Sequence, residues 1–289
     1  MICGGYTGNY DGVKCPKYFI EILGECNLKL PRPIEPKKFD ETSIFLTKEN
    51  EIMIVVQRWN DAECYKFING EWKPQNPPKD RLYPKFDGYS MQNGSYLISP
   101  NSCSGLITTT FLPNGQEEWK TGPEFKFSSG DMVHFIQSSK TNIIGTGGTE
   151  FPSRIFKFNV ETKEVTEIGK LQVGRWMHTS AIFNGKLIVT GGFNYKTTGL
   201  IRSTDIIDLE SGISRLGGNL NVHRCHSGMG VITLNGKQKL IVFGGELDVM
   251  AIDSIEEWDE ETETWKISDL KLGIGRHSFR TCTLQDQEF

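Results

Sequence analysis

Short apolar runs bounded by glycine and asparagine follow one another along the whole chain. One of the clearest is KLIVT, residues 186–190, which stops at Gly191-Gly192. Runs of this length, rich in β-branched residues and flanked by turn residues, predict strands. The apolar period of 3.6 residues that marks a long amphipathic helix is absent. The pattern therefore predicts an all-β protein.

The glycine doublet recurs at the ends of apolar runs. It closes ICGG at Gly5, IIGTGG at Gly148, LIVTGG at Gly192 and LIVFGG at Gly245. Two further runs, IMIVVQR and SYLISP, end where a doublet would be due but lack it. The six marks begin at positions 4, 57, 99, 147, 191 and 244, so they lie about 53, 42, 48, 44 and 53 residues apart. A period near 50 residues is typical of propeller blades.

Each repeat unit follows the same order of predicted strands. HTSAIF leads through a turn into KLIVTGG, then come the alternating run STDIIDLES and a last strand that often carries tryptophan, as at Trp72, Trp119 and Trp265. Asn-Gly pairs, which favour tight hairpin turns, occur at 69–70, 93–94, 114–115, 184–185 and 235–236. Four short antiparallel strands repeated six times predict a six-bladed β-propeller.

The two ends of the chain carry complementary parts of one blade. The chain opens on a second strand, MICGG, and finishes on an innermost strand, HSFRTCTL at 277–284. Pairing them would complete the last blade and remove an open sheet edge. We therefore predict one propeller domain over 1–289, with blades at about 1–36 plus 276–285, 37–79, 80–124, 125–173, 174–220 and 221–272.

These features resemble the kelch-repeat family over essentially the whole chain. The repeats that contain the last three doublets match best, and an arginine opens the unit after each of them: GRWMH (Arg175), HRCHS (Arg224) and GRHSF (Arg276). The second and third repeats keep the strand pattern without the doublet. The resemblance implies that the doublets pack near the axis and that the loops after the second strands surround the channel entrance on one face. No helix or Lys-Ser/Thr follows a doublet, so the doublets are not phosphate loops.

The positions after the marks and at the starts of the following units carry arginines and aromatic residues, which are common in binding hot spots. We therefore predict a rim that holds a protein or peptide, and three arginines would favour an acidic one. In the alternative interpretation, the arginines pair with neighbouring acids and stiffen the blades. The predicted rim residues are Tyr6, Trp59, Asn101, Arg175, Trp176, His178, Phe193, Arg224, His226, Glu246, Arg276 and His277.

Metal and catalytic sites have little support in the sequence. His223 and His226 stand at an H-x-x-H spacing, but no carboxylate lies at a convincing ligand spacing. The E-x-x-x-D-x-x-x-H motif of the iron-using kelch proteins of glucosinolate breakdown is absent. We therefore expect no metal, no cofactor and no catalytic residues, and a metal-dependent enzyme is the less favoured alternative.

Charge and hydropathy restrict the partners. The formal net charge is −4 and no block of Lys or Arg is present, which argues against nucleic acid. No apolar stretch approaches the ~18 residues that a membrane span needs, so we expect no membrane insertion. The N-terminus lacks the features of a signal peptide, so the chain as it stands is expected to be a cytoplasmic, monomeric propeller. An upstream signal peptide would make it extracellular.

The seven cysteines contain no C-x-x-C pair, and reduced, buried thiols are the simplest interpretation. However, EILGECNLKLP and AECYKFINGEW resemble segments of secreted invertebrate kelch proteins. That resemblance implies a disulfide between Cys26 and Cys64 if the protein is extracellular, and the glycosylation sequon at Asn93 would fit that setting.

The combined features predict a non-enzymatic binding scaffold for proteins or peptides. One alternative is the substrate-recognition module of a cullin-type ubiquitin ligase adaptor, which would need BTB and BACK regions that these 289 residues do not contain. The other is a stand-alone interaction protein, either actin-associated and cytoskeletal or extracellular.

Overall fold

The computed structural model describes residues 2–3, 20–21, 41–49, 51–57, 61–79, 86–101, 106–126, 132–196, 199–248 and 250–282. Within these ranges the chain forms strands, turns and loops, and it forms no helix. It follows that none of these residues belongs to a helix able to cross a membrane. The all-β prediction is confirmed.

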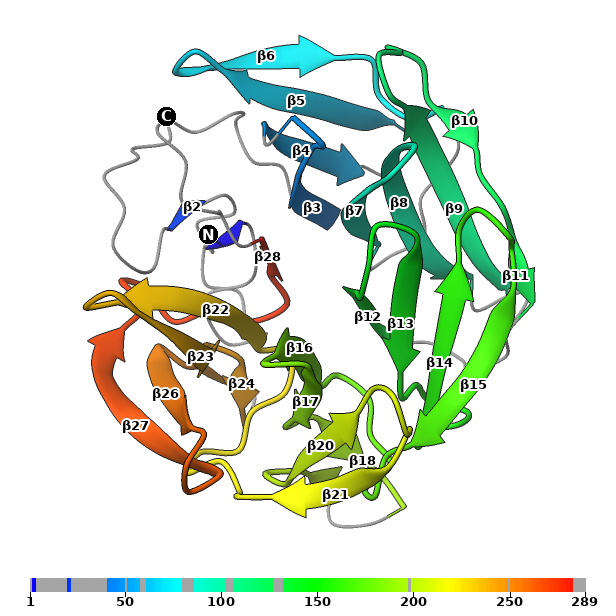
Figure 1. The fold of residues 1–289 in the computed structure, drawn as a ribbon. Coiled ribbons are helices and arrows are strands. Elements are labelled where there is room, and N and C mark those ends of the chain that lie inside the picture. The colour runs from blue at the N-terminus through cyan, green and yellow to red at the C-terminus, as the bar shows by residue number, and fades with distance from the viewer. Residues whose placement is uncertain are drawn as a thin grey trace.

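Six antiparallel sheets stand in a ring in the described part of the chain (Figure 1). In each of the five larger sheets, which we call the blades, the strands run outward from the axis in sequence order, except that β11 of the second blade pairs with β9 alongside β10. This arrangement is a β-propeller, as the repeated units predict.

The five blades have the following strands. The first contains β3 (Glu41–Leu46), β4 (Ile52–Gln57), β5 (Ala62–Ile68) and β6 (Glu71–Gln75), and the second contains β7 (Asp87–Met91), β8 (Gly94–Asn101), β9 (Leu106–Pro113), β10 (Lys120–Thr121) and β11 (Phe125–Lys126). The third contains β12 (His134–Gln137), β13 (Asn142–Thr146), β14 (Arg154–Asn159) and β15 (Val165–Lys170). The fourth contains β16 (Thr179–Phe183), β17 (Lys186–Thr190), β20 (Thr204–Asp208) and β21 (Ser214–Gly217), and the fifth contains β22 (Gly228–Leu234), β23 (Lys237–Phe243), β26 (Ser254–Asp259) and β27 (Thr264–Lys271).

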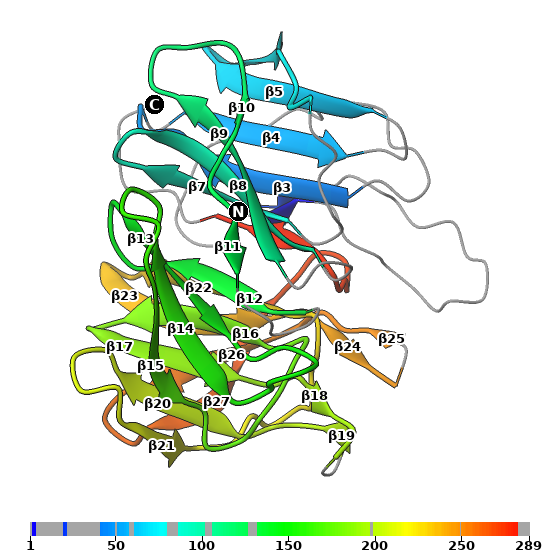
Figure 2. The ribbon, with the colours of Figure 1, turned by 90° about the vertical axis from the view of Figure 1, so that its right-hand side faces the viewer.

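Two short hairpins follow the second strands of the fourth and fifth blades. They are β18 (Phe193–Asn194) with β19 (Gly199–Leu200), and β24 (Glu246–Leu247) with β25 (Met250–Ala251). Both project from the same side of the ring (Figure 2). The loop at 149–153 also joins the second strand of a blade to its third. We call the side with these three connections the doublet face, because each connection follows a glycine doublet.

The sixth sheet, the closing sheet, joins the two ends of the chain. It contains β1 (Ile2–Cys3), β2 (Ile20–Glu21) and β28 (Arg280–Thr281), with β1 in the middle. Ile2 lies opposite Thr281, and β28 contacts both β22 and β3. The closing sheet therefore fills the place between the fifth and first blades. The predicted closure of the ring by its terminal strands is confirmed.

The Asn-Gly pairs form the expected hairpin turns. Asn69, Asn184 and Asn235 have φ of 51°, 47° and 51°, and the glycines after them also have positive φ. Two successive positive φ values define the type I′ turn, whose twist matches that of the strands. The turn before β8 differs, because Met91 pairs with Gly94 and the turn residues are Gln92 and Asn93, one residue earlier than predicted.

The apolar core lies between neighbouring blades. In one cluster, Ile188 and Ile206 of the fourth blade pack with Leu240, Val242 and Trp258 of the fifth. The second strands carry many of the most deeply buried side chains. Full burial of one aliphatic side chain contributes roughly 1.5–3 kcal/mol, so each blade is stabilised chiefly by its neighbours.

Two tryptophans near the outer edges, Trp119 and Trp265, each tie their blade to the preceding one. The Trp265 indole Nε1–H donates to Thr204 Oγ1 of the fourth blade (2.8 Å). The Trp119 Nε1–H donates to the carbonyl of Asn76, which follows the first blade (3.0 Å). Trp119 lies just before β10 rather than within a strand. The recurrent tryptophan is thus a bridge between blades.

Candidate functional site

The glycine doublets fix each blade against the opening of the next. The second glycine of each doublet donates its N–H to the carbonyl of the following arginine: Gly148 to Arg175 (3.2 Å), Gly192 to Arg224 (2.9 Å) and Gly245 to Arg276 (2.8 Å). Gly191 has φ of 70°, and a Cβ there would lie 2.6 Å from the Arg224 carbonyl oxygen. Only glycine fits this backbone without strain, which agrees with a packing role for the doublets.

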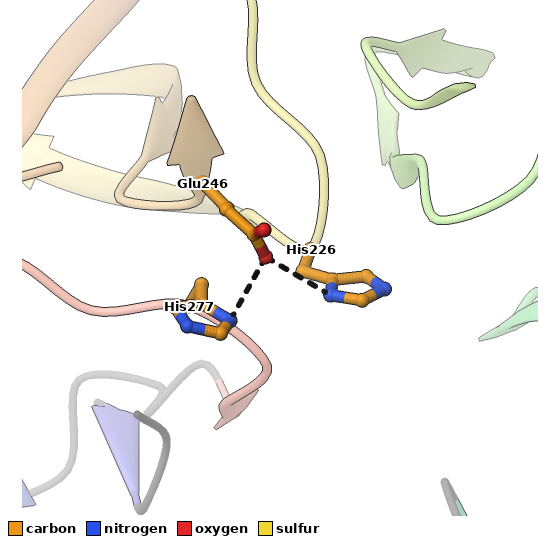
Figure 3. A group of neighbouring side chains, drawn as sticks. All are labelled: His226, Glu246 and His277. Carbon is orange, nitrogen blue, oxygen red and sulfur yellow. Dashed lines mark ion pairs between the residues drawn. The ribbon is translucent and has the colours of Figure 1, made fainter. Parts of the chain in front are cut away.

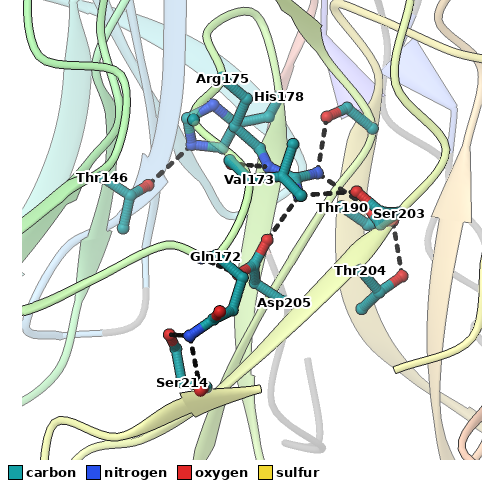
Figure 4. Close-up of polar contacts among 12 residues, drawn as sticks. Thr146, Gln172, Val173, Arg175, His178, Thr190, Ser203, Thr204, Asp205 and Ser214 are labelled. Atoms are coloured by element: carbon teal, nitrogen blue, oxygen red, sulfur yellow. Dashed lines mark hydrogen bonds and ion pairs between the residues drawn. The ribbon is translucent and has the colours of Figure 1, made fainter. Parts of the chain in front are cut away.

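Arg175 is completely buried inside the fourth blade (Figure 4). Its Nη2 lies 2.5 Å from Asp205 Oδ2, and its Nη1 donates to the carbonyls of Gly191 (3.0 Å) and Ser203 (2.7 Å). Asp205 in turn accepts the backbone N–H of Gln172. Burial lowers the pKa of the guanidinium, and the Asp205 charge opposes that shift. The arginine thereby links three separate segments of the blade.

Arg224 makes the same contacts in the fifth blade. Its Nη2 lies 2.8 Å from Glu256 Oε1, and its Nη1 donates to the carbonyls of Gly244 (2.8 Å) and Ser254 (3.0 Å). The backbone N–H groups of Asn221 and Val222 donate to the same carboxylate. A buried charge is tolerated only when it is paired and hydrogen-bonded in this way.

Arg276 occupies the equivalent place at the start of the closing sheet and is also completely buried. Its Nε donates to the carbonyl of Ile274 (3.2 Å). With no exposed area, Arg175, Arg224 and Arg276 offer no surface to a ligand, so a rim of exposed arginines does not form. For Arg175 and Arg224 the alternative interpretation applies, since each pairs with an acid and stiffens its blade.

His178 lies near the axis with His134, their ring centroids 5.7 Å apart. His178 Nε2 is 2.8 Å from Thr146 Oγ1, and His134 Nδ1 is 2.9 Å from Ser180 Oγ. Burial lowers the pKa of His134 to about 4 and lowers that of His178 well below its ordinary value. Both imidazoles are therefore neutral near pH 7. With His178 only 4% exposed, this pair is part of the packing between the third and fourth blades.

Aromatic side chains gather on the doublet face of the fourth blade. Trp176 is buried and exchanges two backbone hydrogen bonds with the half-buried Phe193. Tyr195, at the tip of the β18–β19 hairpin, is 79% exposed, and its ring centroid lies 5.1 Å from that of Trp176 and 4.7 Å from that of Phe193. Phe151 holds the same place after its doublet in the third blade and is 45% exposed.

Sequence reasoning named Trp176 and Phe193 but missed Tyr195 and Phe151. Both missed residues stand three positions after the second glycine of a doublet, and that shared place was the available signal. Of the other predicted rim residues, Tyr6 and Trp59 lie outside the described residues. Asn101 ends β8, and its side chain lies outside the described part.

The structure brings together three of the predicted residues, His226, Glu246 and His277 (Figure 3). Glu246 begins the β24–β25 hairpin, and the two histidines come from the loops that lead into β22 and β28. Nδ1 of His277 lies 3.3 Å, and Nδ1 of His226 lies 3.8 Å, from Oε2 of Glu246. The side chains of His226 and Glu246 are each 14% exposed, so the cluster opens to solvent on the doublet face.

The H-x-x-H spacing is not what forms this cluster. His223 is absent from it, and the Nδ1 atom of His223 is buried without a hydrogen-bond partner. Glu246 and His277 lie far along the chain from His226, in a hairpin and in the terminal segment. They come together where the fifth blade meets the start of the closing sheet, so no local motif could identify them as a set.

Cys64 is a buried, free thiol in β5. Burial raises its pKa to about 12. Its predicted partner, Cys26, lies outside the described residues, so the disulfide stays a prediction.

A search with protein-family models finds no match to the chain, and a comparison with curated proteins finds none either.

Proposed function

We propose that the protein is a non-enzymatic binding scaffold of the kelch type, which holds a protein or peptide partner on the doublet face. β-Propellers display loops of varied sequence on a rigid ring, and binding residues are commonly carried by such loops. The doublet arginines and glycines maintain the ring, while the connections after them carry the side chains available for contact.

The observation that carries the proposal is the exposure of Tyr195 over Trp176 and Phe193. A tyrosine that is 79% exposed and backed by the buried Trp176 and the half-buried Phe193 can cover a large apolar area at little cost in conformational entropy. Phe151 presents a second exposed aromatic ring on the connection of the adjacent blade. The expectation of an acidic partner rested on three exposed arginines, and these arginines are buried. We therefore propose a partner with apolar or aromatic anchors.

A peptide-display selection with the purified protein as bait tests this proposal. The enriched peptides are then titrated against the wild type and the double variant Phe151→Ser/Tyr195→Ser. The matched control is Ile213→Ser/Leu216→Ser, which removes two exposed apolar side chains from the outer edge of the fourth blade.

We expect about a tenfold or greater loss of affinity in the first variant and none in the control, since aromatic anchors dominate binding energy. Failure to enrich any sequence, or equal affinity for all three proteins, would contradict the proposal.

A further inference from the structure

We propose that His226, Glu246 and His277 form a binding site for one divalent first-row transition ion, at the junction of the fifth blade and the closing sheet. The candidate ligand atoms all lie within 4.8 Å of one another. The proposal does not depend on the binding function proposed above.

The spacing of the three atoms suits a shared ion. Two ligands that each lie ~2.1 Å from a metal at tetrahedral angles are ~3.4 Å apart. The Nδ1 atoms of His277 and His226 lie 3.3 and 3.8 Å from the same Glu246 oxygen. Both distances are close to that separation, so a single ion can contact Glu246 Oε2 and both Nδ1 atoms.

A fourth polar atom lies beside the two histidines of the cluster. Ser278 Oγ is 2.9 Å from His226 Nδ1 and 3.2 Å from His277 Nδ1. The hydroxyl stands beside both of the nitrogen atoms that would coordinate the ion. It can hydrogen-bond to an imidazole lone pair before metal enters and afterwards to a metal-bound water.

The backbone around these ligands is held by hydrogen bonds between segments. His226 N–H donates to the Met177 carbonyl (2.8 Å), and Ser278 N–H donates to the His226 carbonyl (3.0 Å). Glu246 exchanges two backbone hydrogen bonds with Cys225 (2.9 and 3.2 Å). Ligands on a fixed backbone lose little conformational freedom when an ion binds, and this favours affinity.

The fold itself does not require these three side chains. In the fourth blade, Met177 stands in the place of His226, two residues after the opening arginine. Phe193 stands in the place of Glu246, directly after the doublet, and Cys225 stands in the place of His277, directly after the next arginine. Met177 and His226 share the left-handed backbone, with φ of 56° and 52°. One junction is thus packed mainly with apolar groups, while the next carries two imidazoles and a carboxylate in the same positions.

The set of ligands indicates the class of ion. Imidazole suits Zn²⁺, Fe²⁺ and their neighbours, and one carboxylate offsets half of a divalent charge. Three protein ligands leave a coordination position for water. The 14% exposure of His226 and Glu246 provides solvent access, whereas His277 is nearly buried.

The test is a calorimetric titration of metal-stripped protein with ZnCl₂. We expect one equivalent to bind, with roughly a 100-fold or greater loss of affinity in Glu246→Gln and in His277→Gln, because each removes a direct ligand. His223→Gln is the matched control, since it removes a histidine of the same loop that is outside the cluster, and we expect it to bind like the wild type. Thermal unfolding of each metal-free protein shows whether it is folded.

A second readout uses Co²⁺ as a spectroscopic probe of the wild-type protein. We expect visible bands of nitrogen and oxygen coordination without the charge-transfer band of a thiolate, and this result stands even where a variant fails to fold. The proposal is overturned by absence of binding, by a thiolate band, or by a His223→Gln variant that loses as much affinity as the ligand variants. A Glu246→Gln variant that is folded and binds zinc normally also overturns it.

Discussion

Arg224 Nη2 lies 2.8 Å from Glu256 Oε1, and both side chains are completely buried in the fifth blade. Arg175 and Asp205 form the same pair in the fourth blade. In the third blade the register places Phe156 where the acid would stand, so the charge is replaced by an apolar ring. The buried ion pair therefore stiffens those blades in which both the arginine and the acid are present.

Removing one member of this pair should destabilise the protein strongly. We expect Arg224→Met to cost about 3–5 kcal/mol, because Glu256 is left as an uncompensated buried charge. In thermal unfolding this corresponds to a fall in Tm of roughly 10 °C. Arg215→Met is the control, since it breaks an exposed ion pair with Glu263 that contributes about 1 kcal/mol or less. Equal shifts in the two variants would rule out the stiffening role.

Buried neutral histidines predict acid sensitivity. The folded-state pKa of His134 is about 4, below the ordinary value of 6.5. Between these values the unfolded chain binds the extra proton, so His134 lowers the stability by about 3 kcal/mol at most as the pH drops from 6.5 towards 4, and the buried His178 adds to this loss. Urea unfolding at several pH values should show this loss, and His134→Asn should make the profile less steep. A wild-type stability that stays constant over that range would refute the assignment.

The Cys64 thiol should be unreactive in the folded protein, because its pKa is raised to about 12 and the thiolate is the nucleophile. We expect iodoacetamide at pH 8 to leave Cys64 unmodified until the protein is denatured. Labelling in denaturant with and without reductant then tests the disulfide with Cys26, which would block Cys64 until it is reduced. Rapid labelling of the native protein would contradict the buried placement.

The ring and its closure could be predicted from the sequence because the doublets, turns and strand runs recur with one period. Each is a local signal with a geometric cause, such as the left-handed backbone at Gly191. The pairing of the terminal strands could be predicted because each has the pattern of one part of a blade. ICGG has the pattern of a second strand without an innermost strand before it, and HSFRTCTL has the pattern of an innermost strand without the strands that complete its blade.

The side-chain environment was harder to predict. An arginine next to an aromatic residue in a predicted loop is expected to be exposed. Arg175 is buried instead, because it pairs with Asp205, which lies 30 positions later in the chain. An acid inside an otherwise apolar strand, as in STDIID, was the signal for a buried pair. The cluster of His226, Glu246 and His277 depends on the packing of the fifth blade against the segment that leads into the closing sheet, and it has no local motif.

Ring closure is the central claim, because the pairing of β1 with β28 joins the two ends of the chain into one propeller. Calorimetric unfolding of a chain ending at Gly275, beside one ending at Cys282, tests it most directly. The account predicts a clearly higher Tm for the longer chain, which retains β28. The shorter one, which loses β28 and the buried Arg276 and Phe279, should unfold about 10 °C or more lower. An identical Tm for the two truncated chains would contradict it.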